Sequence, residues 1–220
     1  MRDYIETISG MPMFAGIKPA ELDEMLSCLN SYTREYEKGE YILFADEPVP
    51  CVGVVIAGTV QMIKEDLWGG KIILTDCVPG DLFGESFVCA GALYSSVTFK
   101  AASDVSVLFM PFDRVMHTCT MACVFHHRLI ENMVDLLARK NIRLIEKIEI
   151  VSKKTIREKI LTYLSILVQK TGSMQVELPM SRTELADYLC ADRSALTREL
   201  ANMKRDGLID FDRNSFTLYK

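Results

Sequence analysis

Two arginines and two hydroxyl-bearing residues near the end of the chain have the types and spacing needed to read DNA. At about 100° per residue they fall on one side of a predicted helix: Arg193, Ser194, Thr197 and Arg198. Arginine forms bidentate hydrogen bonds with guanine in the major groove, and hydroxyl groups bond to bases or phosphate. The opposite side is apolar: Leu196, Leu200 and Met203. The pattern favours a DNA-reading helix over the alternative, the solvated face of an ordinary helical hairpin.

The segments around this helix complete a helix–turn–helix with a wing. A capping box, SRTE, starts the preceding helix, with Ser181 as N-cap and Glu184 three residues later. The chain then breaks at Cys190, and Asp192 is a good N-cap for the second helix. Apolar runs within 209–219 predict a closing hairpin.

The charge of the chain is divided between its front and rear parts. The 220 residues carry a net charge of −5, but residues 1–151 sum to −8 and residues 152–220 to +3. A basic rear segment indicates a polyanionic partner for that segment alone. With 49% hydrophobic residues, the chain is expected to form packed cores rather than remain disordered.

The residue pattern in front of the helix–turn–helix changes twice along the chain. A short helix is predicted within 12–30, and short apolar runs separated by Gly and Pro turns over 34–112 predict an antiparallel sandwich or barrel. Residues 113–150 lack Gly and Pro and predict a long helix, followed by a helix over 155–169 and a strand near 176–178. The expected strands of the front part are 41–44, 52–56, 60–63, 72–75, 97–101 and 105–110.

An apolar seam runs along the long helix. Its members are Ile130, Met133, Leu137, Leu144, Ile148 and Val151. The helix spans roughly 50 Å at about 1.5 Å per residue, more than a small domain needs for its own core. A parallel two-helix dimer contact is therefore favoured, and the polar step Lys140-Asn141 would set its register. Packing of the seam on the preceding β-domain is the alternative.

In this order, a β-sandwich, a long helix and a winged helix–turn–helix resemble the Crp/Fnr superfamily of bacterial transcription regulators over almost the whole chain. The motifs that carry the resemblance are KGEYILFADE (38–47), VIAGTVQM (55–62), VPGDLFGES (78–86) and DRSALTREL in the last helix pair. The resemblance implies DNA reading by the four residues named first and places Ser181 and Arg182 near phosphates. One departure is Cys190, where such motifs commonly have glycine. A positive φ there would cost roughly 1 kcal/mol or more.

The resemblance also implies an effector site in the β-roll. Family members that bind cyclic AMP hold the ribose with a Gly-Glu pair, present here as Gly84-Glu85. A structural role for Glu85, as a cap or fold-stabilising carboxylate, is the alternative. The long-helix positions expected at the adenine are Leu144 and Ile145, both apolar.

The Arg-Ser pair with which those members hold the cyclic phosphate reads Ser95-Ser96 here. Moreover, 35–113 contains no arginine, and a buried phosphate without a cation is poorly compensated. Lys100 could reach the phosphate only if its strand is regular. Cyclic AMP is therefore not the expected effector.

Other sensors of the family carry an iron–sulfur cluster or haem. Only Cys28 precedes the β-region, so four-thiolate ligation near the N-terminus does not fit. Cys119 and Cys123 are interpreted as buried free thiols in preference to a metal contact or a disulfide. The histidines are expected on the surface of the long helix and not as haem ligands: His117, His126 and His127. The remaining possibilities are an unidentified small effector, apolar or anionic, or no effector at all. No cofactor is expected.

The sequence thus predicts an α+β chain of three parts: a β-roll sensor domain like those that bind cyclic nucleotides (1–112), a long dimerisation helix (113–151) and a winged helix–turn–helix (152–220). The expected partners are double-stranded DNA with a roughly palindromic operator and a second copy of the chain, with RNA polymerase as a further candidate. The first residues resemble no signal peptide and no apolar run reaches ~18 residues, so a cytoplasmic protein without a membrane contact is expected.

The sequence has two alternative interpretations. A cupin-like metal oxygenase needs histidines on the strands, and 1–116 contains none, so an enzyme is not expected. The second is a regulator that acts through protein contacts, without DNA readout or an effector.

Overall fold

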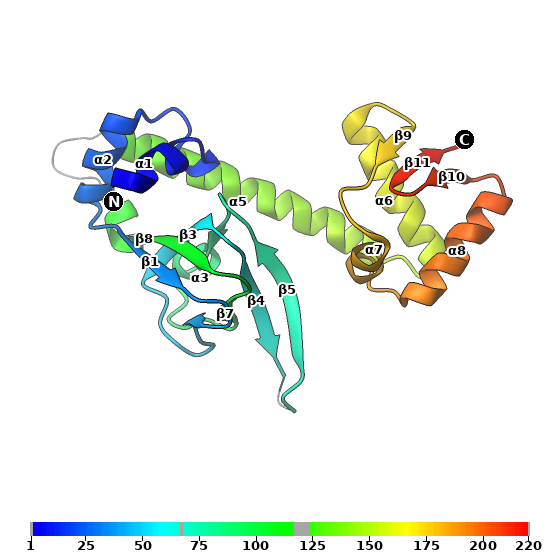
Figure 1. Cartoon of the computed structure of the whole chain (residues 1–220), viewed down its shortest axis with the longest axis horizontal. Coiled ribbons are helices and arrows are strands. Elements are labelled where there is room, and N and C mark those ends of the chain that lie inside the picture. The colour runs from blue at the N-terminus through cyan, green and yellow to red at the C-terminus, as the bar shows by residue number, and fades with distance from the viewer. Residues whose placement is uncertain (1, 67, 117–123, 220) are drawn as a thin grey trace. The chain divides into compact units, whose positions relative to one another are not determined.

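Helix α5 (Val124–Val151) supplies residues to both compact units of the chain. In the computed structural model, the described residues are 2–66, 68–116 and 124–219. The units comprise Met1–Leu137 and Ala138–Lys220. Figure 1 follows the chain through them, from the strands β1 to β8 to the helices α6, α7 and α8. The expected order of β-roll, long helix and winged helix–turn–helix is confirmed.

Two four-stranded antiparallel sheets form the β-roll of the first unit, in the orders β1-β8-β3-β6 and β2-β7-β4-β5. The first contains β1 (Tyr32–Tyr36), β8 (Val105–Pro111), β3 (Cys51–Ala57) and β6 (Leu82–Phe83). The second contains β2 (Tyr41–Leu43), β7 (Thr98–Ala101), β4 (Val60–Glu65) and β5 (Lys71–Cys77). A short helix, α3 (Glu85–Cys89), follows β6.

Strand β8 is apolar on both faces because both faces are covered. Val105 and Val107 belong to the core between the two sheets. Leu108 and Met110 belong to a second core, which the helical segments share. Those segments are α1 (Arg2–Ser9), the 3-10 turn Pro12–Phe14, α2 (Pro19–Cys28), α4 (Phe112–Met116) and the first turns of α5.

Part of the predicted dimer seam has a different environment from the one expected. Met133 is buried in the core of its own unit, and Ile130 and Leu137 pack against that core. This half of the seam therefore packs on the preceding β-domain, which was the alternative to a dimer contact. In the other half, Leu144 and Ile148 are exposed, by 60% and 63%. An amphipathic pattern shows that a face is buried but not what covers it.

The second unit is a three-helix domain with a three-stranded sheet. Its helices are α6 (Ile156–Thr171), α7 (Arg182–Tyr188) and α8 (Arg193–Arg205). The sheet has the order β10-β11-β9, with β10 (Ile209–Asp212) and β11 (Ser215–Leu218) as the wing and β9 (Gln175–Glu177) beside them. Its core unites one residue of α5, Ile150, with the apolar faces of α6, α7 and α8.

Several local expectations need correction. The helix expected within 12–30, with Pro19 at its start, is confirmed as α2, and a 3-10 turn precedes it, whereas α1, β1, β6 and α3 were not predicted. Of the described cysteines only Cys77 is buried, whereas Cys51 is half-buried and Cys28, Cys89 and Cys190 are exposed. Cys119 and Cys123 lie outside the described residues. Within the described ranges, no helix combines the length and apolarity needed to cross a membrane.

Candidate DNA-binding and effector sites

Helix α8 is fixed by its cap and by its buried side. The side chain of Asp192 accepts a hydrogen bond of 2.8 Å from the backbone N–H of Ala195, as expected of an N-cap. Leu196, Leu200 and Met203 are 0–2% exposed and anchor the helix in the core of its unit. The orientation of the other side of α8 is therefore set by packing, not by the polar residues themselves.

The four residues predicted to read DNA all lie exposed on that side: Arg193, Ser194, Thr197 and Arg198. The Thr197 hydroxyl donates to the carbonyl of Arg193 at 2.9 Å, which holds its oxygen against the preceding turn of the helix. Neither Arg193 nor Arg198 forms a side-chain hydrogen bond or ion pair within the described part of the chain. Two unpaired guanidinium groups on a rigid face suit an anionic ligand.

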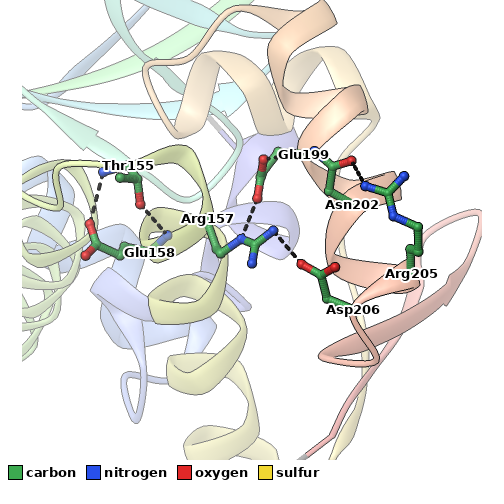
Figure 2. Close-up of polar contacts among 7 residues, drawn as sticks. All are labelled: Thr155, Arg157, Glu158, Glu199, Asn202, Arg205 and Asp206. Atoms are coloured by element: carbon green, nitrogen blue, oxygen red, sulfur yellow. Dashed lines mark hydrogen bonds and ion pairs between the residues drawn. The ribbon is translucent and has the colours of Figure 1, made fainter.

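One arginine of α6 pairs with both Glu199 of α8 and Asp206, the C-cap of that helix. Arg157 donates to Glu199 at 2.5 Å and to Asp206 at 2.8 Å, as Figure 2 shows. Asn202 and Arg205 extend this network along the same helix (Figure 2). The clamp ties α6 to both ends of the C-terminal half of α8. It also leaves the exposed arginines free of competition from the carboxylates of their own helix.

Helix α7 begins as the sequence predicts, but its two candidate phosphate-binding residues are engaged within the protein. The Ser181 hydroxyl accepts from the Glu184 N–H at 3.3 Å, and Glu184 accepts from the Ser181 N–H at 2.7 Å. The guanidinium of Arg182 lies over the rings of Phe211 and Phe216 in the wing and donates to the carbonyl of Arg213. Burial lowers the pKa of Arg182. The structure therefore places Arg182 as a link between α7 and the wing, apart from the exposed face of α8.

The turn between α7 and α8 has the backbone that the missing glycine suggested. Cys190 has a φ of 49°, in the left-handed region that a side chain disfavours. Lysines from two other helices cap the carbonyls here. Lys159 of α6 donates to Leu189 at 3.0 Å and Lys147 of α5 donates to Tyr188. Cations at the C-terminal end of a helix also interact favourably with its dipole.

In the β-roll, the Gly84-Glu85 pair occupies a tight turn. Gly84 has a φ of 78°, and a Cβ there would lie 3.2 Å from the carbonyl oxygen of Cys51, so the turn requires glycine. Glu85 begins α3, is 3% exposed and accepts from the Ser86 hydroxyl at 3.1 Å. A buried carboxylate in the first turn of a helix fits the structural role as well as it fits a ligand contact.

The Ser95-Ser96 pair provides little for a phosphate. The buried Ser95 hydroxyl donates to the Val97 carbonyl at 2.6 Å and accepts from the Val97 N–H at 3.2 Å, closing its own turn. Ser96 is exposed, and its carbonyl accepts from the ammonium of Lys64 at 2.6 Å. Lys100 lies 5.1 Å from the centre of the Tyr41 ring. Lys64 is thus a cation in direct contact with the pair, and sequence reasoning missed it.

Leu144 and Ile145, the positions expected at the adenine, belong to the second unit, whereas the glycine, glutamate and serines above belong to the first. Both residues are exposed, by 60% and 58%. Together with Val134, Ile142 and Ile148 they form an exposed apolar stripe of α5, which we call the outer stripe. Within it, Asn141 lies seven residues after Val134 and four before Ile145, and Ile148 follows three residues later, in the spacing of a coiled-coil seam.

The histidines differ from one another. His126 is 1% exposed, against the surface position expected, and burial lowers its pKa. His127 is exposed and lies 3.3 Å from Glu131 on the next turn of α5. His117 lies outside the described residues.

Comparison with known proteins adds two domain matches. A model of the cyclic nucleotide-binding domain matches residues 33–120, and a model of the Crp-like helix-turn-helix domain matches residues 158–219. The first covers the β-roll and the second the unit that contains α8.

Similar proteins extend over most of the chain. It is 25% identical over 189 residues to the transcriptional activator protein FnrL of Cereibacter sphaeroides, covering 81% of this chain and 72% of that protein. It is 25% identical over 204 residues to the cyclic AMP receptor protein of Thermus thermophilus, covering 92% and 89%. In fold it is similar to the c-di-GMP responsive regulator CLP of Xanthomonas campestris, with a TM-score of 0.60 and 18% identity over 92% of this chain and 100% of that one.

Proposed function

The chain belongs to the Crp/Fnr superfamily of DNA-binding transcription regulators, a family without enzymatic activity, and we propose that it reads a roughly palindromic operator as a homodimer. We further propose that a small effector other than a cyclic nucleotide controls it. The reading residues are those exposed on α8: Arg193, Ser194, Thr197 and Arg198.

The observation that carries the proposal is the pair of unpaired arginines, Arg193 and Arg198, on a helix whose own carboxylates are held by Arg157. The first of them lies in the first turn of α8, the end that enters the major groove in helix–turn–helix proteins. Ser181 and Arg182 are proposed as a flanking contact to phosphate, in which Arg182 would add a phosphate to its contact with the wing.

The homodimer is proposed to form through the outer stripe of α5. Five large apolar side chains exposed by 55–63% on one helix are more than an isolated surface needs to leave uncovered. Asn141, in the middle of the coiled-coil spacing, would pair with its counterpart in a second copy and fix a parallel register. A two-fold protein in turn matches a palindromic operator.

For the effector, the names of similar proteins differ: one is a cyclic AMP receptor protein and another is c-di-GMP responsive. The family therefore does not fix the ligand. In this chain the Ser95 hydroxyl closes its own turn with Val97, and among the described residues no arginine is bonded to it. A cyclic phosphate would lose its bidentate partner, which disfavours cyclic nucleotides.

Selection of bound sites from a pool of random duplexes tests the function directly. We expect enrichment of two-fold symmetric sites with half-site centres about 34 Å apart. Affinity for the selected site should fall steeply with salt, because phosphate contacts release counterions. A pool without enrichment, and binding that does not respond to salt, would instead favour a regulator that acts through protein contacts. RNA polymerase stays a candidate partner for the DNA-bound form.

A further inference from the structure

A cavity of about 240 Å³ opens beside strand β1, on the face that continues into the core of the roll. Its walls come from β1, from the segment that leads into β3, and from the Gly84 turn. Neither serine of the Ser95-Ser96 pair lines it. The cavity is thus distinct from the phosphate position that the family resemblance implies.

Aromatic rings form one wall of the cavity. Tyr32 stacks on Phe109 with ring centres 5.3 Å apart and planes 24° apart. Tyr36 and Phe83 meet Phe109 edge to face at 6.5 Å and 6.1 Å. The rings brace one another, so the wall is preorganised for a flat apolar group.

Among the described residues that line the cavity, Arg34 alone carries a charge. Its guanidinium lies 4.9 Å from the centre of the Tyr36 ring and forms no ion pair with any described carboxylate. Glu35, its neighbour in β1, is committed elsewhere and accepts from the Tyr4 hydroxyl at 2.8 Å. An arginine that contacts Tyr36 but pairs with no described carboxylate, at the edge of an aromatic cavity, is arranged to accept a carboxylate.

A second donor lies in the same wall. The Tyr32 hydroxyl lies 3.9 Å from the Cys51 sulfur, a weak partner that leaves most of its hydrogen-bonding capacity unused. Burial raises the pKa of Tyr32 to about 12, so the hydroxyl keeps its proton at neutral pH. Arg34 and Tyr32 are next-but-one neighbours on one face of β1 and offer donors to the same space.

The size of the cavity limits the ligand. Drug-sized molecules occupy pockets of about 300–1,000 Å³, whereas a cavity of about 150 Å³ holds benzene. At about 240 Å³ there is room for one ring with a short polar substituent. We propose that this cavity binds a single-ring aromatic carboxylate, with the carboxylate on Arg34 and Tyr32 and the ring against Phe109. The site stands by itself, but its action as an effector site rests on the proposed function.

Titration calorimetry of the full chain with benzoate tests the site, with benzylamine as the ligand of opposite charge. We expect benzoate to bind and benzylamine not to bind. Arg34→Gln should weaken benzoate binding about ten- to hundredfold, because a charge-assisted pair is lost. Arg34→Lys keeps the charge but not the planar guanidinium, so its affinity for benzoate should lie between that of the wild type and that of Arg34→Gln. Arg143→Gln, which removes an exposed arginine of α5 that does not line the cavity, is the matched control and should leave binding unchanged.

Folded wild-type protein that gives no heat with millimolar benzoate would overturn the site. So would an equal effect of Arg34→Gln and Arg143→Gln. Binding of benzylamine as tight as that of benzoate would likewise show that charge does not select the ligand. DNA anisotropy on the same samples separates the two proposals: benzoate binding without DNA binding refutes the proposed function and leaves the site intact.

Discussion

The ammonium group of Lys147, on α5, donates to the backbone carbonyl of Tyr188 at the end of α7 and lies 3.9 Å from the centre of the Tyr188 ring. Burial lowers the pKa of Lys147, so the protein bears a desolvation cost to keep the cation there. Glu146, the preceding residue, pairs with Lys170 of α6 at 2.6 Å. These contacts attach the end of the long helix to the helix–turn–helix within one unit.

Replacement of Lys147 by Met keeps the apolar stem and removes the charge. We expect the free energy of unfolding to fall by about 1 kcal/mol, because the Tyr188 carbonyl loses its donor and the ring loses its cation. Denaturant titration measures the change. Lys154→Met, at an exposed lysine whose side chain pairs with no described residue, is the control. Equal effects of both substitutions would mean that the contact contributes nothing specific.

Arg193→Ala and Arg198→Ala test base reading. Each should cost about 1–3 kcal/mol on the selected operator and little on random DNA, because a base contact carries sequence information and a phosphate contact does not. Fluorescence anisotropy on both duplexes measures the difference. Arg205→Ala, at the far end of α8 where the side chain is bonded to Asn202, is the matched control. A loss of the same size on both duplexes would reassign the residue to the phosphate backbone.

The outer stripe predicts where a dimer can be broken. The double substitution Ile145→Asp and Ile148→Asp should shift sedimentation from dimer to monomer, because unpaired carboxylates would enter an apolar seam. Arg143→Asp, exposed on the opposite side of α5, should not. Leu137→Asp should lower thermal stability instead, since Leu137 packs against the core of its own unit. Dimers that survive the double substitution at micromolar concentration would place the subunit contact elsewhere.

Cyclic AMP and cyclic GMP should not bind in the micromolar range. The missing guanidinium corresponds to roughly 1.5–3 kcal/mol, or about ten- to hundredfold in affinity. Ser95→Arg adds a cation but removes both hydrogen bonds of the Ser95 hydroxyl to Val97, so we expect it to lower the Tm without conferring binding. Calorimetry that gives a micromolar Kd for either nucleotide with the wild type would contradict this.

Glu184 makes the start of α7 sensitive to acid. Hydrogen bonds from the Ser181 backbone and hydroxyl hold the pKa of Glu184 below its ordinary value of 4.5. A carboxyl whose pKa is lower in the folded state stabilises the fold fully above the unfolded pKa, and this contribution is lost as the pH falls through the folded pKa. The Tm difference between wild type and Glu184→Gln should therefore shrink as the pH drops below 4.5. A difference that is constant down to the lowest accessible pH would exclude this role.

The fold was predictable wherever burial leaves a mark in the sequence. Strands such as β3 and β8 are covered on both faces and so appear as apolar runs, which only Ser106 interrupts in β8. Strand β1 reads YTREY and was missed, because much of it is exposed. Helix α1 was missed as well, since only Ile5 and Ile8 mark its buried side within a polar segment.

The candidate DNA site was predictable because one helix carries it. Periodicity alone places Arg193 and Arg198 opposite the apolar side of α8. The residues that support the site were not predictable, because they act over long separations in sequence. Arg157 meets Glu199 across 42 positions, and Lys147 meets Tyr188 across 41. Arg34 likewise enters the cavity beside Gly84 only through the pairing of β1 with β8.

Helix α5 contributes Met133 to one core and Ile150 to the other, and between Leu137 and Glu146 its side chains are almost all exposed. A segment of that length is too short to be a stable helix by itself in water. Its order must be propagated from the anchored turns at each end. Helix–coil cooperativity thus makes this stretch the part of α5 that should unfold locally at the lowest free-energy cost. Its amide hydrogens should exchange faster than those near Met133 or Ile150. Association of two outer stripes should slow the exchange of these amides most.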